Sequence, residues 1–251
     1  MRVKISFLRT QGSNNTVPLH HQKLVSSFVE SIIAEINYKP RSYNFSSLKG
    51  TSKVQNGFMR FLSSKVSLVV SSDSGDFIER FTQKIFEKPF VTIGKLSLVP
   101  KMQQMIDYPD FTTKMRYVCI SPLVIADPEK EPELSQRVID PTSHEFSDHI
   151  YNAVAERMEK AGFTDAELNE FAEFEVIPDA HYITKINESG KKYARHYKNN
   201  QDFPMIGYLI PFTLHAHPKV HKFIWDCGLG QLATHGYGMV DIVKEGGDSE
   251  F

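Results

Sequence analysis

The sequence contains few of the residues that mark several common protein classes. It has two cysteines, Cys119 and Cys227, among 251 residues, too few for a disulfide framework and without the paired spacing of a zinc site. We interpret both as reduced core residues. No apolar run approaches the ~20 residues that a membrane span requires, and the N-terminal segment alternates apolar and polar residues where a signal peptide would be continuously apolar. We therefore expect a cytoplasmic protein that is not bound to a membrane.

Other familiar signatures are absent as well. No Gly-Lys-Ser/Thr motif is present, which excludes the phosphate-binding loop of nucleotide hydrolases. No low-complexity tract argues for disorder, and 41% hydrophobic and 24% charged residues are typical of a globular protein. The length suits one large domain or two of ordinary size.

Charge is distributed unevenly, although the net charge is only −1. Residues 1–126 contain 17 Lys and Arg against 8 Asp and Glu, whereas residues 127–179 contain 4 against 15. A second basic segment, residues 181–222, also contains five of the ten histidines. Segregated positive charge suits a ligand rich in phosphate, and solvated surface charge explains the composition equally well.

We expect a mobile loop at the acidic stretch 127–133 and a flexible tail at 245–251.

The first half of the sequence predicts the order β-α-β-β-α-β. Pro18 is expected to open a first helix, whose apolar residues recur every four positions, and Ser74 is expected to cap a second. Asn56-Gly57 predicts a hairpin turn, and residues 101–112 are expected to form a loop. The expected strands are 3–8, 43–48, 58–71 and 91–98.

The second half predicts the same order. Helices are expected at 143–160, ending before Gly162, and at 218–227, opened by Pro218. Two such units predict an α+β fold of two tandem ferredoxin-like domains, each βαββαβ and similar to RNA-recognition motifs, with a glycine-rich loop near the C-terminus. The expected strands are 115–125, 171–186, 203–216 and 237–243, and the expected domains are 1–112 and 113–244.

The segment Cys227–Met239, CGLGQLATHGYGM, is the most informative part of the sequence. Glycine allows positive φ and close approach of the backbone to a ligand, so amide N–H groups of this loop are candidates to hold phosphate oxygens. A dinucleotide-binding fingerprint does not fit, because that motif follows a strand and begins a helix, and here the order is reversed. A glycine-rich connection without a ligand is the alternative.

This loop, GLGQLATHGYGMV, resembles the signature loop of the CRISPR-associated repeat endoribonucleases, members of the RAMP superfamily. Three other segments agree with that family in type and order: VPLHHQKLVSSFVESII with the start of its first helix, CISPLVI with the strand that begins its second domain, and IGYLIPFTLHAHPKVHKFIWDCGLG with the run into the glycine loop. The resemblance spans nearly the whole chain.

The resemblance implies binding of CRISPR repeat RNA and a single cut in which the 2′-hydroxyl attacks the adjacent phosphate, leaving a 2′,3′-cyclic phosphate and yielding guide RNAs. It also implies that the reaction needs no metal and no cofactor, and that the protein is located in a prokaryotic cytoplasm. Such chemistry needs a base at the nucleophile, an acid at the leaving group and a cation beside the developing charge. Other CRISPR effector or adaptation proteins and a second copy of this chain are the protein partners that we consider.

The sequence departs from the family pattern where a catalytic histidine is expected. Enzymes of this family usually take it from the helical region of the first domain, beyond the start of the first helix, and no histidine occurs between His21 and His144. Some relatives cut without one, mainly by holding the RNA in line. The candidate catalytic residues are therefore His20, His21, Tyr38, Tyr43 and Lys49.

The candidate RNA-binding residues are the loop glycines, one loop histidine and the basic residues that precede the loop. Three histidines that lie close together in the sequence could be metal ligands, but no Cys or carboxylate completes a ligand set. They are His215, His217 and His221. GFMRFLSSK at 57–65 is vaguely similar to the aromatic strand of RNA-recognition motifs, lacks the required small residue, and is interpreted as an ordinary amphipathic strand. The RNA-binding candidates are Gly228, Gly230, His235, Gly236, Gly238, Lys185, Lys191, Lys192, Arg195 and Lys198.

Two other functions stay open at this stage. The absent histidine also fits a catalytically inactive RNA-binding RAMP subunit, or a domain of a larger CRISPR protein. A metabolic ferredoxin-like enzyme that binds a phosphorylated small molecule at the glycine loop is more remote. Binding to RNA with a steep dependence on salt concentration would argue against the last.

Overall fold

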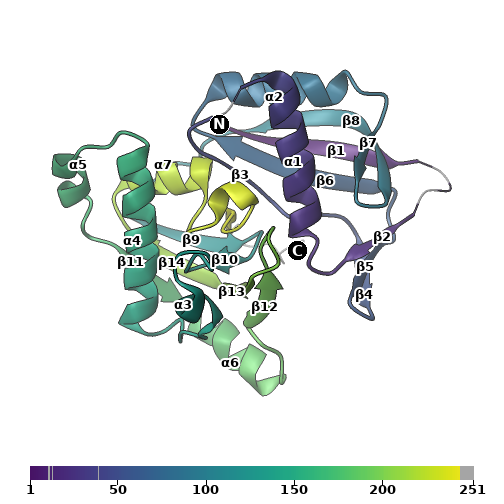
Figure 1. Ribbon diagram of the computed structural model, residues 1–251. Coiled ribbons are helices and arrows are strands. Elements are labelled where there is room, and N and C mark those ends of the chain that lie inside the picture. Colours follow the sequence, from purple (N-terminus) through teal and green to yellow (C-terminus); the bar gives the residue numbers. More distant parts are fainter. Residues whose placement is uncertain (11, 13, 39, 244–251) are drawn as a thin grey trace. The chain divides into compact units, whose positions relative to one another are not determined.

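The computed structural model describes residues 1–10, 12, 14–38 and 40–243 (Figure 1). The tail expected at 245–251 lies outside these residues. The chain divides into two compact units. Unit 1 comprises residues 1–107 together with Thr234–Gly236, and unit 2 comprises residues 108–233 and the chain from Tyr237 onward.

Unit 1 is built on a five-stranded antiparallel sheet in the order β3-β6-β1-β8-β7. Leaving out the edge strand β7, this is the order in which the second, third, first and fourth strands of a βαββαβ unit pair, so the ferredoxin-like prediction is confirmed. The core contains apolar side chains from the sheet and both helices, including Ile5, Val29 and Phe81. The elements are β1 (Arg2–Arg9), α1 (Gln22–Ile36), β3 (Tyr43–Phe45), β6 (Lys65–Ser72), α2 (Gly75–Phe86), β7 (Val91–Ile93) and β8 (Leu96–Ile106).

A small second sheet extends unit 1. Its strands are β2 (Thr16–Pro18), β5 (Phe58–Phe61) and β4 (Ser52–Gln55), in the order β2-β5-β4. Strands β4 and β5 form a hairpin closed by Asn56 and Gly57, whose φ angles are 51° and 76°. Two positive φ values are what a two-residue turn between twisted strands requires, so the turn expected at Asn56-Gly57 is confirmed.

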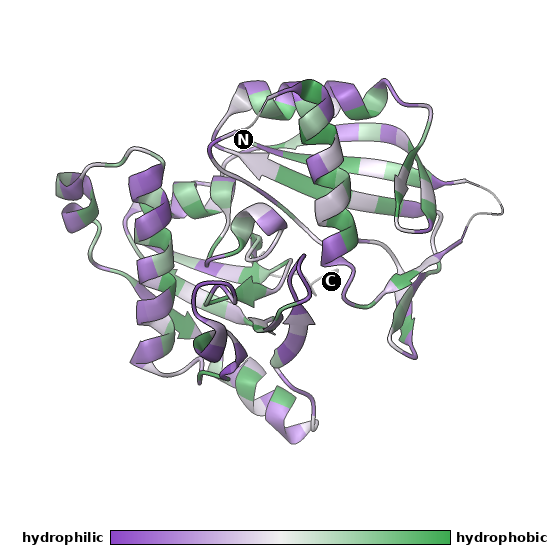
Figure 2. Cartoon of the chain, in the orientation of Figure 1, coloured by the Kyte–Doolittle hydropathy of each residue, from purple (hydrophilic) through white to green (hydrophobic). Residues whose placement is uncertain are grey.

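Unit 2 repeats the arrangement with a four-stranded antiparallel sheet in the order β11-β14-β9-β15. This is again the ferredoxin-like order, with α4 and α7 as the two helices. Hydrophilic residues colour much of α4 and α5 in Figure 2. The elements are β9 (Lys114–Cys119), α4 (His144–Lys160), α5 (Asp165–Glu170), β11 (Glu175–Pro178), β14 (Pro211–His215), α7 (Pro218–Cys227) and β15 (Val240–Ile242).

Further short elements decorate unit 2. A second sheet has the order β10-β13-β12. The last two residues of the acidic loop expected at 127–133 instead begin α3. The one-turn helix η1 lies within the glycine-rich segment and belongs to both units, because Thr234 and His235 cluster with unit 1. These elements are β10 (Leu123–Val124), α3 (Pro132–Gln136), α6 (Ala180–Glu188), β12 (Ala194–Lys198), β13 (Pro204–Tyr208) and η1 (Ala233–His235).

Several expected boundaries were wrong. Pro18 ends β2, and α1 begins only at Gln22, because the chain first pairs with β5. The strand expected at 171–186 ends at Pro178, where the Asp179 side chain caps α6 by accepting from the Tyr182 N–H (2.9 Å). The first half of the expected loop at 101–112 is the second half of β8, and residues 107–112 contain no helix or strand, as expected.

Four expected strands are interrupted. The strand expected at 58–71 consists of β5 and β6, and the one at 91–98 consists of β7 and the start of β8. The strand expected at 203–216 consists of β13 and β14, and the one at 115–125 of β9 and β10. Within the described residues, no helix is long and apolar enough to cross a membrane. Cys119 and Cys227 are both buried and free of disulfides, as expected.

Candidate functional site

His21 is the N-cap residue of α1 and is held from both sides of its ring. Its Nδ1 lies 3.2 Å from the Pro18 carbonyl oxygen and 3.3 Å from that of Leu19, to which it donates as N–H. Its Nε2 accepts from the Leu48 N–H at 3.0 Å. Burial lowers the pKa of His21 to about 4, outweighing the two carbonyl contacts that raise it. The ring is therefore neutral at pH 7, and its acceptor lone pair is already used.

His20 differs from its neighbour because it is exposed. Its charge and that of Lys49 both contribute, after burial, to the lowered pKa of His21, so both groups act on the same point at the start of α1. Lys49 follows Leu48 and is fixed by a pair of backbone hydrogen bonds with Ser67 (2.8 and 2.9 Å). The first turn of α1 contains no acidic residue, so the positive end of the helix dipole is not offset there.

Gln22 connects this point to the glycine-rich segment within unit 1. Its Nε2 donates to the Gly236 carbonyl oxygen (2.6 Å), and its Oε1 accepts from the Ser47 hydroxyl (2.7 Å). Gly236 has φ +82°, and a Cβ at this position would collide with the Gln22 amide and the Phe45 ring. Only glycine therefore allows this segment to approach α1 so closely.

Tyr38 follows α1 at its other end, and a helix of 15 residues spans about 22 Å, so Tyr38 does not belong to the group around His20. Tyr43 lies on β3, two residues before Phe45. The Tyr38 hydroxyl is 2.9 Å from Ser74 Oγ, and its ring stacks on Phe77. Tyr43 is buried in the core, and burial, with a smaller contribution from the charge of Glu30, raises its pKa to about 12. Both rings therefore serve packing.

The glycine-rich segment is extensively bonded within unit 2. The amide of Leu229 donates to the Gly238 carbonyl (2.8 Å), and the amide of Gly238 donates to Pro122 (2.7 Å). The amide of Gln231 donates to Val124 (3.1 Å). These three N–H groups are consequently committed to the fold, and the phosphate contacts expected of the loop stay a prediction for its other groups. Gly228, Gly230 and Gly238 all have positive φ and are all buried.

No sequence motif pointed to Arg157, which organises this segment. Its guanidinium donates to the carbonyl oxygens of Cys227, Gly228 (2.9 Å) and Gly230 (3.0 Å), and lies 5.5 Å from the centre of the Phe223 ring. Burial lowers its pKa to about 10, which leaves it charged at pH 7. The available signal was its position, since Arg157 continues the buried stripe of α4 through Phe146, Ile150 and Ala153.

The basic residues that we expect to bind RNA are all exposed, and they lie on elements that follow one another along the chain. Lys185 lies on α6, Lys191 and Lys192 lie in the connection that follows, and Arg195 and Lys198 lie on β12, an edge strand. His235 is half-buried in η1, and its buried Nδ1 has no hydrogen-bond partner among the described residues.

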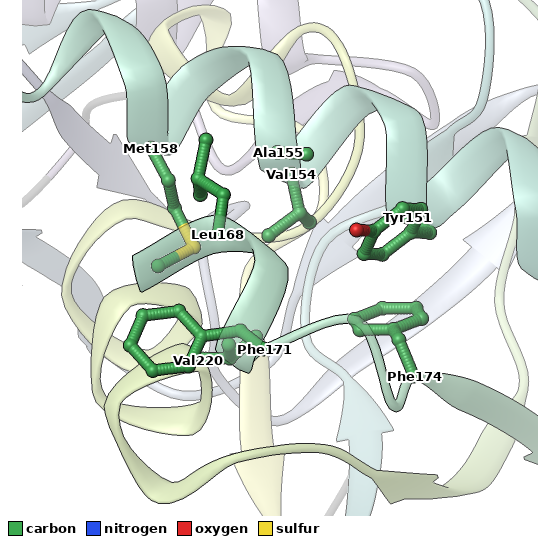
Figure 3. A pocket seen from close by; sticks show the side chains of 8 residues that line it. All are labelled: Tyr151, Val154, Ala155, Met158, Leu168, Phe171, Phe174 and Val220. Atoms are coloured by element: carbon green, nitrogen blue, oxygen red, sulfur yellow. The ribbon is translucent and has the colours of Figure 1, made fainter. Parts of the chain in front are cut away.

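Two other features of the described residues do not indicate a catalytic or metal-binding site. A pocket in unit 2 is lined by apolar side chains of α4, α5, α7 and the segment after α5, and by Tyr151, whose hydroxyl is a polar group (Figure 3). Among the residues that the structure describes, no three His, Cys, Asp or Glu are grouped so as to hold a metal ion. His221 instead packs against Tyr117, whose hydroxyl lies 3.0 Å from its Nδ1.

The chain was compared with known families and proteins. The family model described as CRISPR associated protein Cas6, C-terminal, matches residues 106–242. The CRISPR-associated endoribonuclease Cas6 1 of Methanocaldococcus jannaschii is 22% identical, over 95% of this chain and 92% of that protein.

Solved structures agree over the whole chain. A Cas6-related gene product from Pyrococcus furiosus superposes with a TM-score of 0.76 at 20% identity, covering 98% of this chain and 99% of the other. A RAMP protein described as binding different RNA substrates gives 0.73 at 18% identity, with 97% and 100% covered. At these identities, the likeness concerns the fold.

Proposed function

Because the chain belongs to the Cas6 family of CRISPR-associated proteins, we propose that it binds CRISPR repeat RNA and cuts it once without a metal. The observation that carries the proposal is that an exposed His20 and Lys49 both act electrostatically on His21 at the start of α1. A relative named as an endoribonuclease and a RAMP structure described as binding RNA support it.

In the proposed reaction, His20 is the base and Lys49 the cation. His20 takes the proton of a 2′-hydroxyl, the oxygen attacks the adjacent phosphorus, and the bond to the 5′-oxygen breaks. The 5′-oxygen takes a proton from water as it leaves, and the protonated His20 returns its proton to water, so the products are a 2′,3′-cyclic phosphate and a 5′-hydroxyl. The Lys49 ammonium stabilises the negative charge on the phosphorane oxygens. His21 positions His20 by fixing the entry to α1.

The basic residues of unit 2 are proposed to hold the RNA backbone. Lys185, Lys191 and Lys192 are exposed, as are Arg195 and Lys198 on the adjacent edge strand. Each phosphate contact that such a residue makes should steepen the dependence of affinity on salt. His235 and the loop residues Gly228, Gly230, Gly236 and Gly238 are proposed to act on RNA through the shape of the glycine-rich segment.

The test incubates the purified protein with the repeat RNA of its own CRISPR array in excess EDTA, with products resolved on a denaturing gel. We expect one cut that ends in a cyclic phosphate. His20→Gln and Lys49→Met should each slow it by about 100-fold or more while repeat RNA still binds. His144→Gln, which removes an exposed histidine at the start of α4 in unit 2, is the matched control and should retain the wild-type rate.

Two results would contradict parts of the proposal. Tight binding without a cut would make the chain a guide-holding RAMP subunit. Full cleavage by His20→Gln, with loss in His21→Gln, would overturn the assignment of the base.

A further inference from the structure

In the sheet formed by β2, β5 and β4, here called the side sheet, β5 packs one face on the rest of unit 1 and turns the opposite, outward face to solvent, and all four residues of β4 are exposed. Phe61 is fully buried and Met59 packs against the core, so alternate residues of β5 point inward. Phe58 and Arg60 point the other way and are exposed, with Phe58 at 51%. An exposed phenylalanine at a hairpin tip has no role in the core.

Strand register places the outward residues in two rows. Pro18 pairs with Phe58, and Phe58 pairs with Gln55. In the second row, Thr16 pairs with Arg60, and Arg60 pairs with Lys53. Directly paired residues lie about 5 Å apart at Cβ on the same face, so two cations stand side by side next to an aromatic ring.

The positive charge of this face is not offset locally. Residues 36–72 contain six Lys and Arg and no Asp or Glu. Among the described residues, neither Lys53 nor Arg60 forms an ion pair. Like charges placed directly opposite each other on a sheet are destabilising, so this pair favours an anionic ligand.

The side sheet is also continuous with the proposed centre. The Leu19 N–H, directly after β2, donates to the Gly57 carbonyl at the hairpin turn (2.8 Å), and the next residue is His20. A chain lying along the outward face is thereby led toward the start of α1.

We propose that the outward face of the side sheet binds single-stranded RNA, with Phe58 stacking on a base and Lys53 and Arg60 contacting phosphates. An unpaired base exposes the ring face that stacking needs, which a duplex buries, and base stacking combined with a cationic track is how single strands are held without sequence preference. The inference rests on the proposed function, because it extends the RNA path beyond His20 and Lys49.

The test measures binding of fluorescein-labelled repeat RNA made with 2′-fluoro nucleotides, which lacks the attacking hydroxyl. Phe58→Ala and Phe58→Leu should weaken binding about tenfold, whereas Phe58→Trp should bind as wild type does, because stacking requires a ring. Lys53→Gln/Arg60→Gln should lower the slope of log affinity against log salt by about 1.4, the value for two single-strand phosphates. Lys95→Gln/Lys101→Gln removes the same charge from exposed positions elsewhere in unit 1 and is the control.

Unchanged affinity in the Phe58 and Lys53/Arg60 variants would overturn the inference and leave the hairpin as a protein contact. Equal losses in the control pair would also overturn it, since they would reflect net charge alone. Failure of the wild-type chain to bind the RNA at all would instead refute the proposed function, so the two failures are distinguishable.

Discussion

The glycine-rich segment and the start of α1 differ in how their polar groups are used. In the segment, backbone amides and carbonyls bond to one another, to Pro122 and Val124, and to the Arg157 guanidinium. At the start of α1, His20 is exposed and Lys49 stands nearby on a fixed backbone. The most specific sequence signal therefore marks a segment with many internal hydrogen bonds, and a weaker signal marks the exposed groups that we propose do the chemistry.

This contrast explains why four glycines recur in so short a segment. At Gly238, a Cβ would collide with the Leu229 carbonyl, and at Gly230 with the Val124 carbonyl. The glycines thus allow backbone to pack on backbone. Gly236, which clusters with unit 1, accepts a hydrogen bond from the Gln22 side chain. Their contribution to RNA binding would act through this shape.

The largest expected effect is at Gly238. Gly238→Ala combines a φ of +68° with a collision against backbone, and should lower the free energy of unfolding by about 4 kcal/mol or more. Gly190→Ala is the matched control, because Gly190 has a φ of +66° and nothing within 4 Å of the added Cβ. It should cost about 1 kcal/mol, the strain of the left-handed region alone. Urea unfolding measures both, and equal losses would mean that close packing contributes nothing.

The next effect concerns Arg157. Arg157→Met keeps most of the side-chain volume but removes the donors to three carbonyls, and should cost about 3 kcal/mol in the same assay. Lys160→Met, one turn further along α4, removes an exposed charge that pairs with the partly exposed Glu156 and should cost under about 0.5 kcal/mol. A small loss in Arg157→Met would show that the segment holds its shape without the guanidinium.

Much of the fold could be predicted from the sequence because its signals are local. The helix at 143–160, the Ser74 cap and the Asn56-Gly57 turn depend on residues within a few positions of one another, and the structure confirms each. The missed helix α6 had a local signal too, since Asp179 precedes Tyr182, Ile183 and Ile186 at helical spacing.

The site could be predicted only in part, because its contacts join distant residues. Gln22 and Gly236 are 214 positions apart, and Arg157 bonds to carbonyls about 70 positions later. Nothing in the pair His20-His21 tells which ring is buried. That difference arises from Leu48, whose amide fills the acceptor nitrogen of His21.

The smallest expected effect is the pH dependence that separates these two histidines. The pKa of His21 is lowered to about 4 by burial, against 6.5 when unfolded, so the unfolded chain binds the extra proton between these values. Stability from this residue is complete above pH 6.5 and falls as pH drops toward 4, by about 1 kcal/mol between pH 6 and pH 5. His21→Gln should remove that part of the slope in urea unfolding at the two pH values. His221, whose pKa burial also lowers to about 4, adds the same slope to every variant and cancels in the difference. His20→Gln, at the exposed neighbouring position, should keep the wild-type pH dependence of stability. If His20→Gln removed this dependence and His21→Gln did not, the assignment of His21 as the structural residue and His20 as the proposed base would be reversed.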